Sequence, residues 1–299
     1  MTQHDENTRP ADTASATGDT GEAATIPTEK VTGWWATDIA RIHPGEIALR
    51  GYPVEQLIGR AGFADTIWLM LRGDLPTPGQ GRLLEAALVS AVDHGPQAPS
   101  IAAARMAATC GVGLNNAVAT GVNLLGDVHG GAGQQCMDLL ARLHTEVAAG
   151  ETPDAVAARA VTEHREGGRH VPGFGHRFHP RDPRRDPLLG LLTEAADAGV
   201  VPGDHLAIGL ALEDALATGR RRPVPMNIDG ATALIYSELG FAPELGRGLF
   251  VLSRSVGILA HAWEERRSGT RIKGPIPRPL LADYTGPDLR DVPTTPPQH

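Results

Sequence analysis

Two histidines in glycine-rich loops and one aspartate are the residues of this chain best suited to catalysis. His129 lies in Gly-Asp-Val-His-Gly-Gly-Ala-Gly (126–133), His176 in Pro-Gly-Phe-Gly-His-Arg (172–177) and Asp229 in Asn-Ile-Asp-Gly. Glycine allows positive φ and close approach of a ligand to the backbone, so each loop can point its histidine into a cleft. One carboxylate and two imidazoles can supply a base and two hydrogen-bond donors to reacting oxygen atoms.

Hydrophobic periodicity predicts that helices position these residues, because apolar side chains recur at the spacing of an amphipathic helix. Aromatic residues make up only 4% of the chain and alternating β-branched runs are scarce, which argues against a sheet-rich fold. Thr152 is the expected N-cap of a helix that starts at Pro153. The sequence therefore predicts an all-α fold, with a helix from about Phe63 and others at 81–94, 100–110, 114–125, 132–149, 153–166, 188–198, 203–218, 231–239 and 246–266.

Three polar residues at these helices admit a structural role as well as a functional one. His94 falls at the expected end of its helix, where a histidine can cap free carbonyl groups. Asp229 precedes an apolar helix, where an aspartate is most often an N-cap. Spacing alone favours the capping role for both. Arg254 lies inside an apolar helix, and its buried guanidinium needs either an internal carboxylate or a substrate carboxylate as partner.

The segment 167–187 is dense in glycine, proline and arginine. A loop of this length with little secondary structure of its own is usually functional or disordered. Its arginines indicate an anion-binding site, although a solvated basic loop has the same composition. They are Arg169, Arg177, Arg181, Arg184 and Arg185.

Composition excludes several classes of function. The formal net charge of −8 argues against nucleic acid as a partner. No apolar run reaches the roughly 20 residues of a membrane span, and no signal peptide is recognisable. Cys110 and Cys136 form no disulfide framework, which favours a reducing cytoplasm. The pattern of a P-loop, of a Rossmann motif or of a metal site is also missing. Residues 1–30 have the composition of a disordered tail.

Six motifs, in order, resemble the citrate synthase family between about Arg50 and Pro287. Three are the stretches around His129, His176 and Asp229, and the others are Arg-Gly-Tyr-Pro-Val-Glu (50–55), Val-Asp-His-Gly-Pro (92–96) and Ser-Arg-Ser-Val-Gly-Ile-Leu-Ala-His (253–261). The chain is more similar to the lyases of this family, which are citryl-CoA lyase and the citryl-CoA-cleaving module of ATP-citrate lyase. Two features carry this preference. One is the Gly-Pro that follows the histidine of the 92–96 motif, and the other is the Ile-Asp-Gly form of the aspartate motif.

The resemblance implies a role for each catalytic residue. Asp229 would remove a proton from an acetyl thioester, and His129 would stabilise the resulting enolate. His176 would donate to the keto oxygen that becomes the tertiary hydroxyl. The same groups can work in reverse, so that His176 takes the hydroxyl proton of citryl-CoA and Asp229 protonates the enolate. Citryl-CoA lyase is preferred; the alternatives are citrate synthase or 2-methylcitrate synthase, and a non-catalytic binder of acyl-CoA or tricarboxylates.

The resemblance also implies residues that bind the substrates. The carboxylates of oxaloacetate or citrate would be held by His94, Arg184, Arg254 and Arg278, the last reaching the site of a partner subunit. The CoA thioester is expected as a substrate, with no permanently bound cofactor and no metal. Its predicted contacts are Pro172, Gly173, Phe174, Gly175, Arg220, Arg221 and Arg222.

The family's architecture implies two helical domains with the active site in the cleft between them. The large domain would comprise 31–132 and 246–299, and the small domain 133–245, which carries His176 and Asp229. Closure of the small domain would exclude water. A homodimer is expected, and a separate protein would have to supply citryl-CoA.

Overall fold

The computed structural model describes residues 33–277 and 279–292 of the 299-residue chain. The predicted tail at 1–30 and the candidate substrate residue Arg278 lie outside the described residues. Backbone contacts divide the chain into two units, Met1–Glu55 and Gln56–His299. Within the described ranges, every helix is too short or too polar to cross a membrane.

The described part of the first unit contains a small antiparallel sheet that the sequence analysis did not predict. It comprises β1 (Ala40–His43), β2 (Glu46–Leu49) and β3 (Tyr52–Pro53), in the order β1-β2-β3. Tight turns at Gly45 and at Arg50–Gly51, all with positive φ, join the strands. Strands of two to four residues are too short to show the alternation on which sequence prediction depends. The short helix α2 (Val54–Leu57) follows directly after β3.

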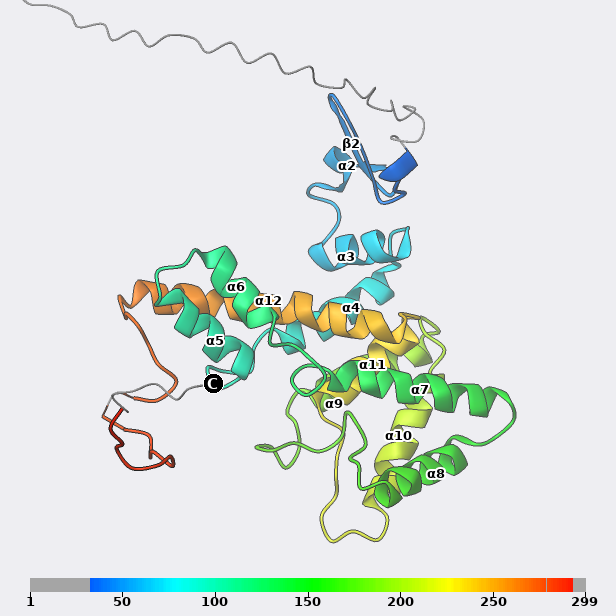
Figure 1. Cartoon of the computed structure of the whole chain (residues 1–299). Helices are drawn as coiled ribbons and strands as arrows, with labels where there is room; N and C mark the ends of the chain where they lie inside the picture. Colours follow the sequence, from blue (N-terminus) through cyan, green and yellow to red (C-terminus); the bar gives the residue numbers. More distant parts are fainter. Residues whose placement is uncertain (1–32, 278, 293–299) are drawn as a thin grey trace, which may run out of the picture. The chain divides into compact units, whose positions relative to one another are not determined.

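The second unit is helical, as predicted, and every predicted helix is present (Figure 1). All the expected boundaries agree within three residues. One of the three-residue differences bears on the candidate site, because the helix that was expected to reach His94 ends at Ala91. Thr152 caps its helix as expected, since its Oγ accepts from the N–H of Ala155 at 3.3 Å. The helices are α3 (Phe63–Arg72), α4 (Pro78–Ala91), α5 (Pro99–Ala108), α6 (Leu114–Val122), α7 (Ala132–Ala148), α8 (Pro153–Glu166), α9 (Arg185–Asp197), α10 (Asp204–Ala217), α11 (Ile228–Glu238) and α12 (Pro243–Arg267).

The longest helix, α12, packs against α4, α5, α6 and α7 and so connects the elements that carry the candidate residues (Figure 1). Its N-terminal half joins a large apolar core in which α11 is almost completely buried. Its C-terminal half forms a second core with α5 and α6, built largely from alanine. Gly121 lets α6 approach α5, because a Cβ there would lie 2.7 Å from the carbonyl oxygen of Ser100. The division into domains at 132/133 and 245/246 remains a prediction.

Candidate active site

The His129 loop is a compact turn that leads directly into α7. The N–H of Gly126 donates to the carbonyl of His129 at 2.9 Å and closes the turn. Gly130 has φ of 101°, and a Cβ on Gly131 would lie 2.6 Å from the carbonyl oxygen of Asp127. Side chains other than hydrogen would open this loop, so the glycines fix the position of His129 relative to the start of α7.

Ser100, in the first turn of α5, sets the tautomer of His129. The Nε2 atom of His129 accepts from the backbone N–H of Ser100 at 3.2 Å and lies 3.0 Å from its Oγ. A backbone N–H can only donate, so the proton of the neutral ring sits on Nδ1. Burial and the charge of Arg254 lower the pKa of His129. His129 is thus a neutral imidazole that presents Nδ1–H as its donor.

The His176 loop and the start of α11 are joined backbone to backbone. The N–H of Gly175 donates to the carbonyl of Pro225 at 2.8 Å, and the N–H of Asn227 donates to the carbonyl of Gly173 at 3.0 Å. The Asn227 side-chain amide adds a bond to the carbonyl of Gly175 at 2.6 Å. A Cβ on Gly230 would collide with the carbonyl oxygen of Gly173. These contacts hold the His176 loop against the helix that carries Asp229.

His176 has the opposite tautomer to His129. Its Nδ1 accepts from the backbone N–H groups of Phe178 and His179, each at 3.0 Å. The proton of the neutral ring therefore sits on Nε2. Burial lowers the pKa of His176, Asp182 opposes that effect, and nearby positive groups add to it. The site thus contains two neutral imidazoles, each with one defined N–H donor.

Asp229 is not the N-cap of α11, which corrects the structural interpretation of its position. Asn227 is the cap, because its Oδ1 accepts from the N–H of Asp229 at 2.9 Å and of Gly230 at 3.2 Å. The Asp229 carboxylate is left for another role. Burial raises its pKa, and the charges of Arg184 and Arg254 only partly offset this effect. A carboxylate with a raised pKa is a stronger base than an ordinary one.

Asp182 is a site residue that the sequence analysis missed. Its side chain is 1% exposed and accepts from Arg184 through both Nε and Nη2, each at 2.9 Å. It also accepts from the N–H of Ile228 at 3.1 Å, in the first turn of α11. Burial opposes ionisation, but the Arg184 bonds hold the pKa of Asp182 at about 2. Asp182 therefore joins the arginine-rich loop to the Asp229 helix; the Asp-Pro-Arg sequence was the available signal.

Arg254 is 5% exposed and has no carboxylate partner among the described residues. Its Nε donates to the carbonyl of Ala91 at 3.0 Å, and its Cζ lies 4.8 Å from the ring centroid of Phe250. Burial lowers its pKa, while Asp93 and Asp229 oppose this effect. The alternative of an internal ion pair is thus not what the structure shows. The Nη groups remain suited to a substrate carboxylate.

His94 lies three residues beyond the end of α4, so it is not a helix cap. Its ring centroid is 5.6 Å from that of His176, in an edge-to-face arrangement. Burial, Arg184 and Arg254 lower its pKa. The charge of Arg184, of Arg254 or of both acts to lower the pKa of each member of the candidate set. Its members are His94, His129, His176 and Asp229.

A cavity of about 650 Å³ lies beside the His176 loop. Of the predicted CoA contacts, the 172–175 backbone and Arg220 line this cavity, whereas Arg221 and Arg222 are exposed outside its lining. Arg169 and Arg177, predicted as anion-binding, also line it. Arg165, in the last turn of α8, lines the cavity as well. From the sequence it was predicted only to lie in a helix. In the described ranges, no group of three or more metal-ligating residues could hold an ion.

Several known proteins are similar to this chain in sequence and in fold. A family model described as the C-terminal domain of citrate synthase matches residues 76–280. Citrate synthase 2 of Bacillus subtilis (strain 168) is 29% identical over 228 residues, which are 76% of this chain and 57% of that relative. Citrate synthase 1 of Mycobacterium tuberculosis (strain CDC 1551 / Oshkosh) is 31% identical over 217 residues, 69% of this chain and 48% of that relative. The chain spans about half the length of these curated relatives.

Among solved structures, the citryl-CoA lyase from Hydrogenobacter thermophilus is similar to this chain. The TM-score is 0.76 and the sequence identity is 33%, and the match covers 87% of this chain and 97% of that chain. Both kinds of comparison agree with the fold class and with the family that the six motifs indicated.

Proposed function

This chain belongs to the citrate synthase family, and on that premise we propose that it is a citryl-CoA lyase, which cleaves citryl-CoA to acetyl-CoA and oxaloacetate. The 33% identity to a structure named citryl-CoA lyase supports this choice. The Gly95-Pro96 sequence after His94, typical of the lyases, supports it as well. The substrates in this proposal are small molecules, and the CoA thioester is a substrate rather than a resident cofactor.

The observations that carry the chemistry are the opposite tautomers of His129 and His176 and the raised pKa of Asp229. The Nδ1–H of His129 would donate to the thioester oxygen, where negative charge develops in the enolate. Asp229 would exchange the proton with the α-carbon of the acetyl group. The Nε2–H of His176 would donate to the oxygen that is a ketone in oxaloacetate and a hydroxyl in citryl-CoA.

Two backbone N–H groups donate to Nδ1 of His176 and so affect how readily the ring gives up its Nε2 proton. They would stabilise the electron-rich ring that forms when Nε2–H gives its proton to the substrate oxygen. By microscopic reversibility, cleavage starts from the same total protonation with the proton on Asp229 instead of on Nε2 of His176, so that the ring can take the hydroxyl proton. The carbon–carbon bond then breaks, and the enolate held by His129 receives a proton from Asp229. Each group thus serves both directions of the reaction.

Arginines would bind the anionic groups of the substrates. Arg254, buried and without a carboxylate partner in the described ranges, would bind a substrate carboxylate bidentately. Arg184 would bind a second carboxylate while its other side remains on Asp182. We propose that CoA occupies the 650 Å³ cavity, with Arg165, Arg169 and Arg220 near its phosphates. A homodimer and a separate enzyme that forms citryl-CoA are further parts of this proposal.

A second candidate function is citrate synthase, or 2-methylcitrate synthase. The sequence relatives of 29–31% identity that carry the name citrate synthase favour it. The two activities share the triad and differ in the fate of citryl-CoA, which a synthase hydrolyses and a lyase cleaves. The same experiment separates them.

The test is to incubate purified protein with citryl-CoA and to identify the products by mass spectrometry. Acetyl-CoA with oxaloacetate is the expected result. Citrate with free CoA would transfer the proposal to the synthase. Absence of both, together with no condensation of acetyl-CoA and oxaloacetate, would refute both activities and leave a binder of these ligands. Asp229→Asn is the matched control, because it should abolish turnover and leave the affinity for oxaloacetate unchanged.

A further inference from the structure

The C-terminal end of α4 is held by side chains and backbone of α12. The last carbonyl groups of a helix have no partner inside the helix. Here Arg254 Nε donates to the carbonyl of Ala91 at 3.0 Å. The N–H of Gly257 donates to the carbonyl of Val92 at 3.1 Å. A Cβ on Gly257 would collide with the carbonyl oxygen of Val92, so only glycine permits this approach. The segment that leads to His94 is thereby fixed to α12.

His261, one turn further along α12, extends this series to the His94 loop. Its Nε2 lies 3.2 Å from Oδ1 of Asp93, and the other oxygen of that carboxylate accepts from the N–H of Gly95 at 3.1 Å. The Asp93 carboxylate thus links His261 of α12 to the backbone N–H of Gly95, and His94 lies between Asp93 and Gly95 in sequence. The backbone of His94 is held at a defined place near His176.

Arg105, on α5, sets the tautomer of His261 from the opposite side. Its Nη1 lies 3.1 Å from Nδ1 of His261. A guanidinium can only donate, so His261 accepts at Nδ1 and carries its proton on Nε2, which donates to Asp93. The hydrogen bonds therefore run in one direction, from Arg105 through His261 to Asp93.

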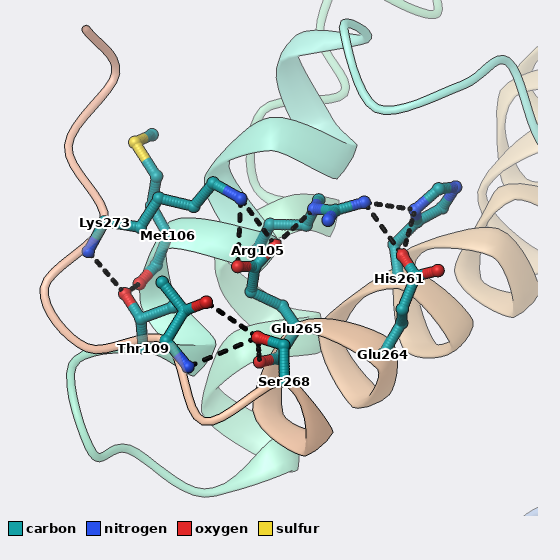
Figure 2. A network of polar contacts seen from close by, with 9 residues as sticks. Arg105, Met106, Thr109, His261, Glu264, Glu265, Ser268 and Lys273 are labelled. Atoms are coloured by element: carbon teal, nitrogen blue, oxygen red, sulfur yellow. Dashed lines mark hydrogen bonds and ion pairs between the residues drawn. The ribbon is translucent and has the colours of Figure 1, made fainter. Parts of the chain in front are cut away.

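Arg105 is itself held in place by carboxylates of α12, as Figure 2 shows. Its Nε donates at 2.6 Å to Glu265, whose side chain is 2% exposed, and its Nη1 donates at 2.9 Å to Glu264. Lys273 Nζ donates to both carboxylate oxygens of Glu265, at 2.9 and 2.8 Å. Burial of Glu265 makes this ion pair a rigid anchor, so Arg105 has one available orientation toward His261.

The same helix also positions His129, because Ser100 in the first turn of α5 donates to His129 Nε2. One end of α5 thus orients a proposed catalytic histidine, and Arg105 at its other end acts on the His94 loop through His261. The two histidines lie on loops that are far apart in sequence, and α5 and α12 provide a common reference for both.

We propose that His261 is a positioning residue, which holds the substrate-binding His94 in place through Asp93 in the tautomer that Arg105 imposes. The inference deepens the proposed function, and it rests on His94 binding a carboxylate of oxaloacetate or of the citryl group. His261 itself does not touch the reacting atoms. A side chain at this place has to accept from a guanidinium and donate to a carboxylate at the same time, which neutral imidazole and primary amides can do.

The test compares His261→Leu, which breaks the chain of hydrogen bonds, with His261→Gln, whose amide can both accept and donate. In the full-length protein, His261→Leu should raise the KM for citryl-CoA and the Kd for oxaloacetate by about 10- to 100-fold, since small displacements of a binding group have effects of this size. The Kd for acetyl-CoA should stay within about twofold of the wild type, because the His94 loop is expected to bind the oxaloacetate part. His261→Gln should recover most of the loss.

Two further variants separate positioning from general stability. Asp93→Asn should produce the same loss, and the double variant with His261→Leu should be no worse than either single one. Arg142→Gln is the control, because it removes an exposed ion pair between Arg142 of α7 and Glu163 of α8, outside the network, and it should leave both affinities unchanged. Equal weakening of acetyl-CoA and oxaloacetate binding in His261→Leu would overturn the inference, as would additivity with Asp93→Asn.

Failure of the lyase proposal and failure of the positioning inference give different experimental results. Wild-type protein without turnover of citryl-CoA refutes the lyase proposal, whereas an active wild type with an unaffected His261→Leu refutes the positioning inference. The imidazole NMR signals of His94, assigned with His94→Gln, report its position without any turnover. They should move in His261→Leu and stay in place in Arg142→Gln, and unmoved signals in both would overturn the inference.

Discussion

Replacing Asp182 by asparagine tests how the arginine loop and the Asp229 helix are joined. The Asp182 carboxylate is 1% exposed, binds the Arg184 guanidinium bidentately and accepts from the N–H of Ile228 in the first turn of α11. Asparagine has the same shape but no charge, and its NH2 group would face an N–H donor of Arg184 or Ile228 that now binds a carboxylate oxygen. Arg184 would lose its ion-pair partner at a partly buried position.

The magnitude follows from the pKa of this carboxyl. Its fall from 3.8 to about 2 corresponds to about 2.5 kcal/mol of folding free energy at neutral pH. For a unit of this size, each kcal/mol shifts the melting temperature by about 2–4 °C. We therefore expect Asp182→Asn to melt about 5–10 °C below the wild type at pH 7. Turnover should fall as well, because Arg184 and the start of α11 lose their common anchor.

The pH dependence gives the sharper check. A group whose pKa is lowered in the folded state stabilises the protein above its unfolded pKa, and this contribution is lost as the pH falls through the folded pKa. The difference in free energy of unfolding between wild type and Asp182→Asn, measured with urea, should be constant from pH 7 down to about pH 5. It should narrow below about pH 4, to roughly half at pH 3.

Asp186→Asn is the matched control. The pKa of Asp186 is also lowered to about 2, by Arg181 and Arg185, but its side chain is 54% exposed. Solvent screens exposed ion pairs, so this variant should lose only about 0–1 kcal/mol. The reasoning would be refuted by equal losses in the two variants, or by an Asp182→Asn difference that does not narrow in acid.

Three further outcomes are expected. Asp229→Asn should lower kcat by several orders of magnitude and raise the melting temperature, since burial raises the Asp229 pKa and the ionised form present at pH 7 is the less stable one. Gly257→Ala should lose about 2 kcal/mol or more in urea unfolding, together with oxaloacetate affinity, whereas Gly248→Ala, in open space on the same helix, should gain about 0.5–1 kcal/mol. In a pH profile of kcat/KM, the acidic decline that reflects His129 and His176 should lie below pH 6.5, because both pKa values are lowered and both rings act in the neutral form. An acidic decline centred above 6.5 would contradict that assignment.

Helical periodicity and composition were sufficient to predict the helical architecture of the second unit. Apolar residues at helical spacing marked α7, α10 and α12, and Thr152-Pro153 marked the start of α8 at its true position. These signals are local, because an amphipathic stripe and a cap are determined by residues a few positions apart. The small sheet at 40–53 escaped prediction, since its strands are too short for a periodic signal and depend on pairing with one another.

The candidate residues could be named from the sequence, but their chemical states could not. The glycine-rich contexts of His129 and His176 indicated loops that aim a side chain. The proton of His129 is placed by Ser100, which folding brings from another helix, and that of His176 by the amides of Phe178 and His179, through the conformation of its own loop.

The sequence by itself determined the helices, the loops and the family of this protein, because these depend on local pattern and on the order of motifs along the chain. Only the tertiary structure decided that Asn227 caps α11 and leaves Asp229 available, that Asp182 holds Arg184, and that Arg254 is buried against a carbonyl and a ring. It also decided that α12 reaches Asp93 through His261. The partners of Arg254 and Asp93 are distant in sequence, whereas Asn227 and Asp182 act on near neighbours. The physical reason is common to all, because burial and the geometry of hydrogen bonds in the folded chain set the charge and direction of a side chain.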